Sequence, residues 1–237
     1  MPPPRPRRRG GGSVVTVGVV LVLLAAVALA WRPVTGWVEE AAAPCGVVLD
    51  GEGVPLDREQ AQAATAAAAG SGEAGEGIPA GVVEAVRGAR EGTALTCRAA
   101  APDVTAQEPT GSGLTPRAQT VLDEIRGTFG DLPTGGYAPG GVDSGHGEDS
   151  THYDGRAVDV FFRPVTEDNL DRGWVLAQWL VAHAEELSVQ YVIFNDHYWG
   201  VRESGRGWQD YRVPGSSDDP VLRHLDHVHV DVVRGQG

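Results

Sequence analysis

The stretch Ser150–Asp159, with the sequence Ser-Thr-His-Tyr-Asp-Gly-Arg-Ala-Val-Asp, constrains the fold more than any other part of the chain. Asp154-Gly155 favours the centre of a type I′ turn, where both residues need a positive φ. A hairpin that turns there pairs His152 with Ala157 and places His152 and Asp159 on the same face. Such diagonal neighbours lie about 7–8 Å apart at the backbone, so the sequence predicts that both side chains can bind one metal ion.

A second pattern, at the C-terminal end, supplies a third ligand. The run His227-Val-His-Val-Asp-Val-Val233 alternates with period two, which predicts a strand with His227 and His229 on one face. Either histidine can complete a three-ligand site with His152 and Asp159, the form of zinc site that leaves a fourth position for water. Hydrolysis by such water also needs a general base nearby. The candidates for that base are Asp226 and His227.

Charge is distributed unevenly along the 237 residues, and the net charge is −13. Residues 1–31 carry four arginines and no acid, which leaves 15 basic and 32 acidic residues in the remainder, a charge of −17. Nucleic-acid binding depends on neutralising phosphates with basic side chains. The sequence therefore predicts no nucleic-acid partner for this acidic part.

The N-terminal region predicts a membrane anchor. Residues 1–13 form an Arg-rich cytoplasmic tail, and residues 14–31 form an apolar run of the length that a bilayer core requires. Arginines before the run and acidic chain after it place the rest of the protein outside the cytoplasm. The alternative is a secretory signal cleaved after Ala28-Leu-Ala30, which gives a secreted protein. Both interpretations export residues 38–237.

Cys45 and Cys97 are the only cysteines, and in an exported chain they are expected to form a disulfide; the alternative is two free thiols. Between them, a helix is predicted after a start signal at Asp57, and a second helix over Pro79–Glu91. Residues 38–98 are thus predicted as a small Ala-rich helical segment that the disulfide stabilises, and we interpret it as a spacer.

A linker is predicted over residues 99–113 and a further domain over residues 114–237. Thr115-Pro116 starts a helix that Gly130 ends, and Thr166 caps a longer helix that runs to about Leu187. Strands are predicted at residues 156–162, 189–194, 198–201 and 227–233. These elements predict an α+β fold, a largely antiparallel sheet with flanking helices.

The metal pattern resembles a known family. Ser-x-His-x6-Asp at residues 150–159, followed by an acid-x-x-His at residues 226–229, resembles the zinc D-alanyl-D-alanine peptidases, whose fold is also called Hedgehog/DD-peptidase. The resemblance covers residues 114–237, about half of the chain. Members cut peptides of bacterial peptidoglycan, so the resemblance implies a membrane-anchored zinc peptidase that acts on cell-wall peptide outside the cytoplasm.

The resemblance also implies roles for individual residues. The zinc ligands would be His152, Asp159 and His229; Asp226 would take the place of the acidic general base; and His227 would be a catalytic or supporting histidine. The predicted substrate-contacting residues are Ser150, Tyr137 and Arg156.

The sequence departs from the family at one position. Members carry an arginine after a Gly-Tyr pair, but here Gly136-Tyr137 is followed by Ala138, and Arg156 or Arg163 would have to replace the missing cation. An oxyanion stabiliser is often worth about 10²–10³-fold in rate. An alternative function is therefore a catalytically weak or inactive metal-containing module that binds cell-wall peptide. A third is a structural wall protein whose histidines bind no metal.

Other chemically active side chains have ordinary structural explanations beside a functional one. His146 borders the site or is a plain loop residue, and Asp231 supports a ligand or is a surface acid. Trp199, Trp208 and Tyr211 either line a groove for a sugar or peptide or pack in the structure, and His224 is a loop residue or touches the site. The residues expected mainly to pack or to lie in loops are His183, His197, Trp174 and Trp179.

Overall fold

The computed structural model describes residues 1, 43–72, 75, 77–147, 149–213 and 217–237. The predicted transmembrane anchor, residues 14–31, lies outside the described residues and stays a prediction. Within the described part of the chain, no helix has the length and apolar character needed to cross a membrane. Ala43–Gly237 group as one compact unit.

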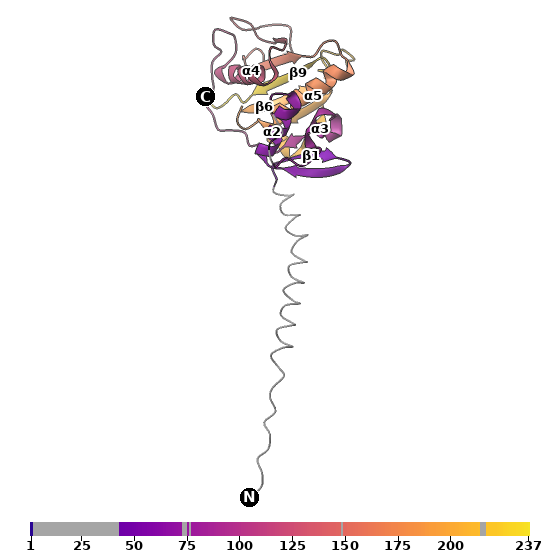
Figure 1. The fold of residues 1–237 in the computed structure, drawn as a ribbon. Helices are drawn as coiled ribbons and strands as arrows, with labels where there is room; N and C mark the ends of the chain where they lie inside the picture. The colour runs from indigo at the N-terminus through magenta and orange to yellow at the C-terminus, as the bar shows by residue number, and fades with distance from the viewer. Residues whose placement is uncertain (2–42, 73–74, 76, 148, 214–216) are drawn as a thin grey trace. The chain divides into compact units, whose positions relative to one another are not determined.

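A six-stranded sheet in the order β4-β5-β9-β6-β7-β8 forms the centre of this unit (Figure 1). Every neighbouring pair is antiparallel, so the predicted α+β class with a largely antiparallel sheet is confirmed. The C-terminal strand β9 lies between β5 and β6 and is therefore hydrogen-bonded on both sides. The bounds are β4 Thr134–Gly135, β5 Ala157–Phe161, β6 Val189–Phe194, β7 His197–Gly200, β8 Gln209–Asp210 and β9 His227–Val232.

Helices α4 (Pro116–Phe129) and α5 (Glu167–Ala182) pack against the sheet. The predicted N-caps are confirmed, because the side chains of Thr115 and Thr166 accept hydrogen bonds from backbone N–H groups in the first turns. Helix α5 ends before the predicted Leu187. The chain then forms turns and enters β6 through Ser188 at φ 54°, which reverses its direction.

The N-terminal part of the unit contains a small antiparallel sheet that the sequence did not predict. Its order is β2-β1-β3, with β1 at Cys45–Leu49, β2 at Glu52–Leu56 and β3 at Thr96–Cys97. The predicted disulfide is confirmed, and it joins Cys45 of β1 to Cys97 of β3. Helix α2 (Arg58–Ala69) begins at the predicted Asp57, whereas α3 (Val82–Arg87) is shorter than predicted because glycines flank both of its ends.

This N-terminal part packs on the helix that covers the large sheet. Gln178 of α5 is fully buried; its Oε1 accepts a hydrogen bond from Leu95 N–H at 2.8 Å, and its Nε2 donates to the Val86 carbonyl at 3.0 Å. Farther along, Ala99 N–H donates to Ser204 Oγ at 3.0 Å, within the predicted linker. Residues 43–98 are thus tied to α5 by buried polar contacts as well as by apolar packing; the predicted boundaries at 99 and 113 stay predictions.

The predicted hairpin at Asp154-Gly155 is wrong. Residues 151–155 form a series of turns, in which Gly155 N–H donates to the His152 carbonyl and Arg156 N–H to the Thr151 carbonyl. Gly155 has a φ of 64°, but Asp154 is not in the positive region, so the type I′ geometry cannot form. Strand β5 pairs with β9 instead, and Asp159 lies opposite His229.

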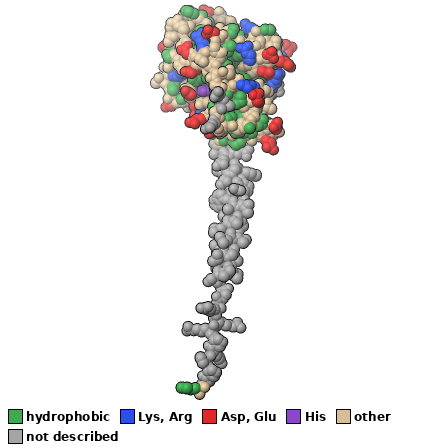
Figure 2. Space-filling view, in the orientation of Figure 1, with side chains coloured by type: hydrophobic (Ala, Val, Ile, Leu, Met, Phe, Trp, Pro, Cys, Tyr) green, Lys and Arg blue, Asp and Glu red, His purple; other side chains and the backbone are tan. Residues whose placement is uncertain are grey.

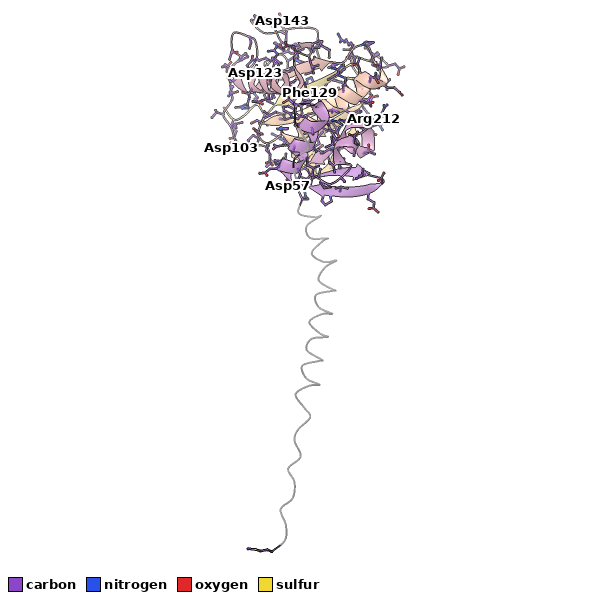
Figure 3. All side chains as sticks on the ribbon, viewed as in Figure 1. Asp57, Asp103, Asp123, Phe129, Asp143 and Arg212 are labelled. Carbon is purple, nitrogen blue, oxygen red and sulfur yellow. A yellow bond between two sulfur atoms is a disulfide. The ribbon has the colours of Figure 1, made fainter. Side chains whose placement is uncertain are left out.

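One face of the unit carries charged groups in a mixed pattern (Figure 2). On the face shown in Figure 2, acidic and basic side chains are interspersed among apolar ones. In Figure 3, Asp57 at the start of α2 and Asp143 in the Gly-rich loop mark opposite ends of the unit. The Gly-rich loop and the N-terminal part with its disulfide therefore lie far apart.

Candidate metal centre and cleft

A cleft of about 460 Å³ lies over the face of the sheet that carries Asp159 and His229. Strands β5, β6 and β9 form its floor, and loops from three parts of the chain form its walls. Residues at alternate positions of β5 and β9, such as Val160 and Val230, point to the opposite, apolar side. The cleft residues used below are Gly136, His146, Ser150, His152, Asp159, Phe161, Arg163, Tyr211, Val221, Leu222, His224, His227 and His229.

Three predicted metal ligands meet on this floor. Oδ1 of Asp159 lies 3.3 Å from Nε2 of His152 and 3.0 Å from Nδ1 of His229. All three side chains are buried. Asp159 and His229 come from neighbouring strands, while His152 reaches them from the loop before β5. The structure therefore brings the predicted set together, although by a different backbone route from the predicted hairpin.

Gly136 fixes the orientation of His152. The carbonyl oxygen of Gly136 lies 2.7 Å from His152 Nδ1, so that nitrogen carries the proton and donates it, and the Nε2 lone pair faces Asp159. Gly136 has a φ of +78°, and a Cβ at this position would overlap the His152 ring. Sequence reasoning marked Gly136 only as the neighbour of Tyr137 and missed this supporting role.

The geometry suits a divalent metal ion. In a tetrahedral site with bonds of about 2.0–2.1 Å, two ligand atoms lie about 3.3 Å apart. The two distances from Asp159 Oδ1 to the histidine nitrogens, 3.3 and 3.0 Å, are close to that value. Nε2 of His229, the ring nitrogen other than the one beside Asp159, is buried and has no hydrogen-bond partner among the described residues. Two imidazoles and one carboxylate form the nitrogen and oxygen donor set that zinc accepts.

The protonation states also suit metal binding. Burial raises the pKa of Asp159, but the adjacent His152 and the hydrogen bond from His229 outweigh burial and hold the pKa well below its ordinary value. Burial lowers the pKa of His229 in spite of the opposing effect of Asp159. Asp159 is therefore anionic and His229 neutral at pH 7, and these are the forms that coordinate a metal.

His146 is a further potential ligand beside the predicted set. Within the described residues, His146, His152 and Asp159 form a group whose donor atoms all lie within 4.8 Å of one another. The rings of His146 and His152 stack, with centroids 4.0 Å apart and an interplanar angle of 27°. This triad differs from the predicted one in having His146 where His229 was expected, and both triads share His152 and Asp159. His229 lies outside this group, although its Nδ1 lies 3.0 Å from Asp159 Oδ1.

His227 and Asp226 form a hydrogen-bonded pair at the edge of this centre. Nδ1 of His227 lies 2.8 Å from Asp226 Oδ1, and Nε2 of His227 lies 3.8 Å from Asp159 Oδ1. His227 lines the cleft, whereas Asp226 is buried behind it and also accepts a hydrogen bond from Arg163. Burial raises the pKa of Asp226. The hydrogen bonds from His227 and Arg163 have the larger, opposite effect and hold that pKa below its ordinary value, so Asp226 is anionic. His227 is therefore the group of this pair that can reach a substrate.

The predicted substrate-contacting residues occupy different places. Ser150 lines the cleft. Tyr137 is not among the lining residues, and its hydroxyl lies 2.9 Å from Thr134 Oγ1. Arg156 is buried and donates to the Val232 carbonyl at 2.8 Å, which directs its guanidinium away from the cleft. Of the two arginines considered as replacements for the missing family arginine, Arg163 is the one that lines the cleft.

One wall of the cleft comes from the loop that carries Val221, Leu222 and His224. The His224 ring lies with its centroid 4.7 Å from that of His227, and burial, followed by the nearby His229 and His227, lowers its pKa to about 3. Val221 and Leu222 are 47% and 49% exposed at the rim, an unusual exposure for large aliphatic side chains. No periodicity or spacing marked this loop, which explains why the sequence offered contact with the site only as an alternative for His224 and gave Val221 and Leu222 no site role.

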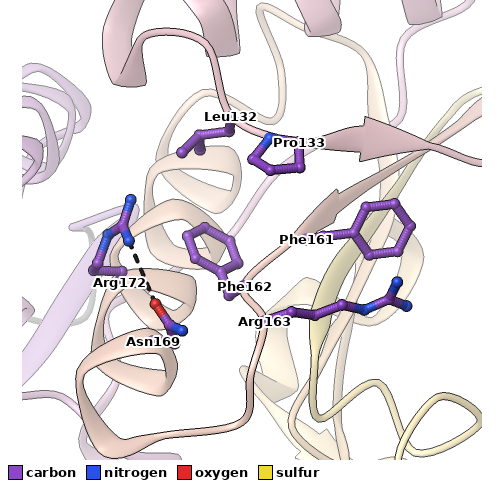
Figure 4. Close-up of a pocket in the computed structure, with 7 residues that line it drawn as sticks. All are labelled: Leu132, Pro133, Phe161, Phe162, Arg163, Asn169 and Arg172. Carbon is purple, nitrogen blue, oxygen red and sulfur yellow. Dashed lines mark hydrogen bonds between the residues drawn. The ribbon is translucent and has the colours of Figure 1, made fainter.

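A second pocket adjoins the cleft (Figure 4). Its volume is about 240 Å³, and Phe161 and Arg163 line both hollows. In Figure 4 the Arg163 side chain lies beside the Phe161 ring, and its guanidinium carbon is 4.1 Å from the ring centroid. On the other side, Arg172 donates to Asn169 Oδ1 at 3.3 Å. The remaining lining residues are Leu132, Pro133 and Phe162.

Comparison with known families gives one match. Residues 110–221 match the family model described as VldE, C-terminal domain, which covers just under half of the chain. The match contains His152 and Asp159 and ends before β9, so His227 and His229 lie beyond it. Comparisons with curated proteins and with solved structures give no match. The match is consistent with a peptidase-like or peptidoglycan-related role for this part of the chain.

Proposed function

We propose that this protein is a zinc-dependent peptidase that hydrolyses peptide bonds of peptidoglycan stem peptides outside the cytoplasm. The observation that carries the proposal is the Asp159 carboxylate, held between His152 Nε2 and His229 Nδ1 on the floor of an open cleft. The Cys45–Cys97 disulfide supports an exported location, because disulfides persist in oxidising compartments. Residues 14–31 would anchor the protein in the membrane. If they are instead a signal that is cleaved, the protein would be secreted.

His152, Asp159 and His229 would hold the zinc. A zinc ion at this position supplies Lewis acidity, which polarises the substrate carbonyl and makes water acidic enough to attack it. The remaining chemistry belongs to the chain. The Gly136 carbonyl keeps the lone pair of His152 Nε2 directed at the centre.

His227 would carry the proton. Its Nε2 faces the cleft, where it can accept a proton from the attacking water and pass it to the leaving amine as the C–N bond breaks. Asp226 accepts the hydrogen bond from His227 Nδ1 and so fixes the tautomer that this role needs. Arg163 donates to Asp226 and keeps that carboxylate anionic. General acid–base catalysis of this kind contributes about 10²–10⁴-fold to a rate.

Metal analysis of the purified ectodomain, residues 38–237, tests the proposal first. We expect about one zinc per chain, and we expect His152→Ala and His229→Ala to lose it because each removes a ligand nitrogen. Full metal occupancy in both variants would exclude the site.

Incubation with muropeptides then tests catalysis. The wild type is expected to release new amino termini, and Asp226→Asn is expected to keep zinc while losing at least about tenfold of this activity. A variant that keeps both zinc and full activity would show that the Asp226–His227 pair has no part in the reaction.

A metal-containing module that binds wall peptide without cutting it is the second candidate. Ala138 follows Gly136-Tyr137 where the resembled family has an arginine, Arg156 points away from the cleft, and Arg163 is bound to Asp226. Zinc binding and muropeptide binding without release of amino termini would favour this candidate. Absence of bound metal would instead favour the third alternative, a structural wall protein.

A further inference from the structure

His146 reaches the metal centre from a different kind of backbone than the three predicted ligands. Asp159 and His229 lie on paired central strands, and His152 is held by the Gly136 carbonyl. His146 lies in the Gly-rich loop and is more exposed than His152 and Asp159. Nevertheless one of its nitrogens falls within 4.8 Å of donor atoms of both His152 and Asp159. The loop therefore carries a fourth donor to the centre.

The hydroxyl of Tyr153 holds His146 in this place. It accepts a hydrogen bond from the His146 backbone N–H at 3.1 Å and donates one to the His146 carbonyl at 2.7 Å. The two rings also meet edge to face, with centroids 6.0 Å apart. Because Tyr153 directly follows His152, the same short segment positions a metal ligand and fixes the loop that brings His146 to it.

The residues on either side allow this loop to move. His146 lies between Gly145, at a φ of +89°, and Gly147, and a Cβ on either glycine would meet no atom within 4 Å. The hydrogen bonds from the His146 backbone to the Tyr153 hydroxyl restrain the loop less than strand pairing restrains Asp159 and His229. Of the four donors, His146 is thus the one that can leave while the others stay in place.

We propose that His146 is a fourth protein ligand of the metal, which closes the centre in the substrate-free protein and withdraws when a substrate enters the cleft. The proposal rests on the proposed function, since it requires that the centre binds metal. Zinc sites with four protein ligands are closed, whereas catalytic sites keep one position open for water or substrate. A ligand on a glycine-flanked loop allows the same centre to adopt both forms.

The test compares the wild-type ectodomain with His146→Ala, loaded with zinc and, separately, with Co²⁺ as a spectroscopic probe. We expect His146→Ala to bind zinc about 10-fold or more weakly in competition with a chelator, on the scale of changes at metal-supporting residues. We also expect its Co²⁺ absorption bands to change position and intensity, because the set of ligands changes. With zinc saturating, peptide release is expected to be faster, with a lower KM, since substrate no longer has to displace an imidazole.

Two further variants make the test specific. Tyr153→Phe keeps every donor atom but removes the hydroxyl that holds the loop, so its zinc affinity and Co²⁺ spectrum are expected to fall between those of wild type and His146→Ala. Asp143→Asn changes an exposed residue of the same loop whose side chain accepts a hydrogen bond from Ser144, and it is expected to match the wild type in both measurements.

The outcomes separate this inference from the proposed function. Unchanged zinc affinity and an unchanged Co²⁺ spectrum in His146→Ala overturn the fourth-ligand proposal, while loss of zinc in His152→Ala would still support the metal centre. Slower peptide release at unchanged metal affinity would also overturn it, because His146 would then contact substrate and not metal. A wild type that binds no zinc overturns both.

Discussion

Strands β5 and β9 present two faces that differ completely in chemistry. On the helix-covered face, Val160 and Val230 are buried among apolar side chains. On the other face, one residue away along the same strands, Asp159 and His229 are buried against each other. Apolar burial stabilises a fold by about 25 cal/mol per Å², whereas buried ionisable groups cost free energy unless they are paired. The same backbone thus combines one face that holds the fold together with one that is built for binding.

The polar face is stabilised by its own internal contacts only in part. Asp159 accepts a hydrogen bond from His229 Nδ1 and lies beside His152 Nε2, but His229 Nε2 has no partner in the described residues. A buried imidazole nitrogen without a partner costs about 1–3 kcal/mol. A bound cation would organise the same groups, so we expect metal to stabilise the protein, while the valine face contributes the same in its presence and absence.

The largest expected effect separates the two faces within one strand. His229→Ala should abolish stoichiometric zinc binding, and it should also cost the metal-free protein about 1–3 kcal/mol because it removes the hydrogen bond to the buried Asp159. Val230→Ala should cost about 2 kcal/mol of unfolding free energy, because it leaves a cavity in the core, while zinc stoichiometry is retained. Zinc titration and urea unfolding on both variants measure this. If Val230→Ala lost zinc as completely as His229→Ala, the two faces would not be independent.

Sequence patterns predicted the elements whose information is local. Thr115 and Thr166 are helix caps that act within three residues, and the alternating His227–Val232 strand places both histidines on one face without knowledge of the rest of the fold. The three predicted ligands were likewise chosen by residue type and spacing. These features depend on side-chain preference and period, which a sequence displays directly.

The rest depends on contacts between distant segments. Strand β1 pairs with β3 at the far end of the disulfide loop, and β2 reads Glu-Gly-Val-Pro-Leu, which has little strand character by itself. His146 and His224 reach the cleft on irregular loops that no periodicity marks. The hairpin prediction failed because the turn dipeptide was considered without β9, which takes the place beside β5.

The second test weakens the helix-covered side far from the cleft. Replacing both cysteines, Cys45→Ser with Cys97→Ser, should lower the unfolding free energy by about 4 kcal/mol, since it frees a loop with a sequence separation of 52 in the unfolded chain. Zinc affinity of the folded fraction should stay as in the wild type. Unfolding under non-reducing conditions measures the unfolding free energy, and competition with a chelator measures the zinc affinity. A large drop in zinc affinity would mean that the N-terminal part shapes the centre.

The third test acts on the cleft side through backbone space alone. Gly136→Ala places a methyl group where the His152 ring lies, and it should reduce zinc affinity about 10-fold by turning the ring away. Gly140→Ala is the matched control, because Gly140 also has a positive φ, +87°, but a Cβ there meets no atom within 4 Å. In both variants, an alanine in the left-handed backbone conformation adds about 1–2 kcal/mol of strain. Equal zinc affinities in the two variants would remove Gly136 from the site.

The smallest effect concerns pH and a histidine on the helix-covered side. His183 ends α5, and its Nδ1 lies 2.9 Å from the Trp179 carbonyl. Burial lowers the pKa of His183 from 6.5, although the Trp179 carbonyl and the acids Glu186 and Glu124 oppose the shift. The unfolded chain therefore binds a proton more readily than the folded one as the pH falls through 6.5, and stability decreases in that range.

His183→Gln tests this contribution, since glutamine cannot take up the proton. Between pH 7.5 and 5.5, the variant should lose less unfolding free energy than the wild type, with the difference lying within about 1 kcal/mol. Urea unfolding of metal-free protein at both values gives the comparison, and the cleft histidines His224 and His229 contribute equally to both proteins. If wild type and variant lost the same unfolding free energy between the two pH values, the pH dependence of stability would belong to the cleft face alone. The two faces would then differ in proton uptake as well as in metal binding.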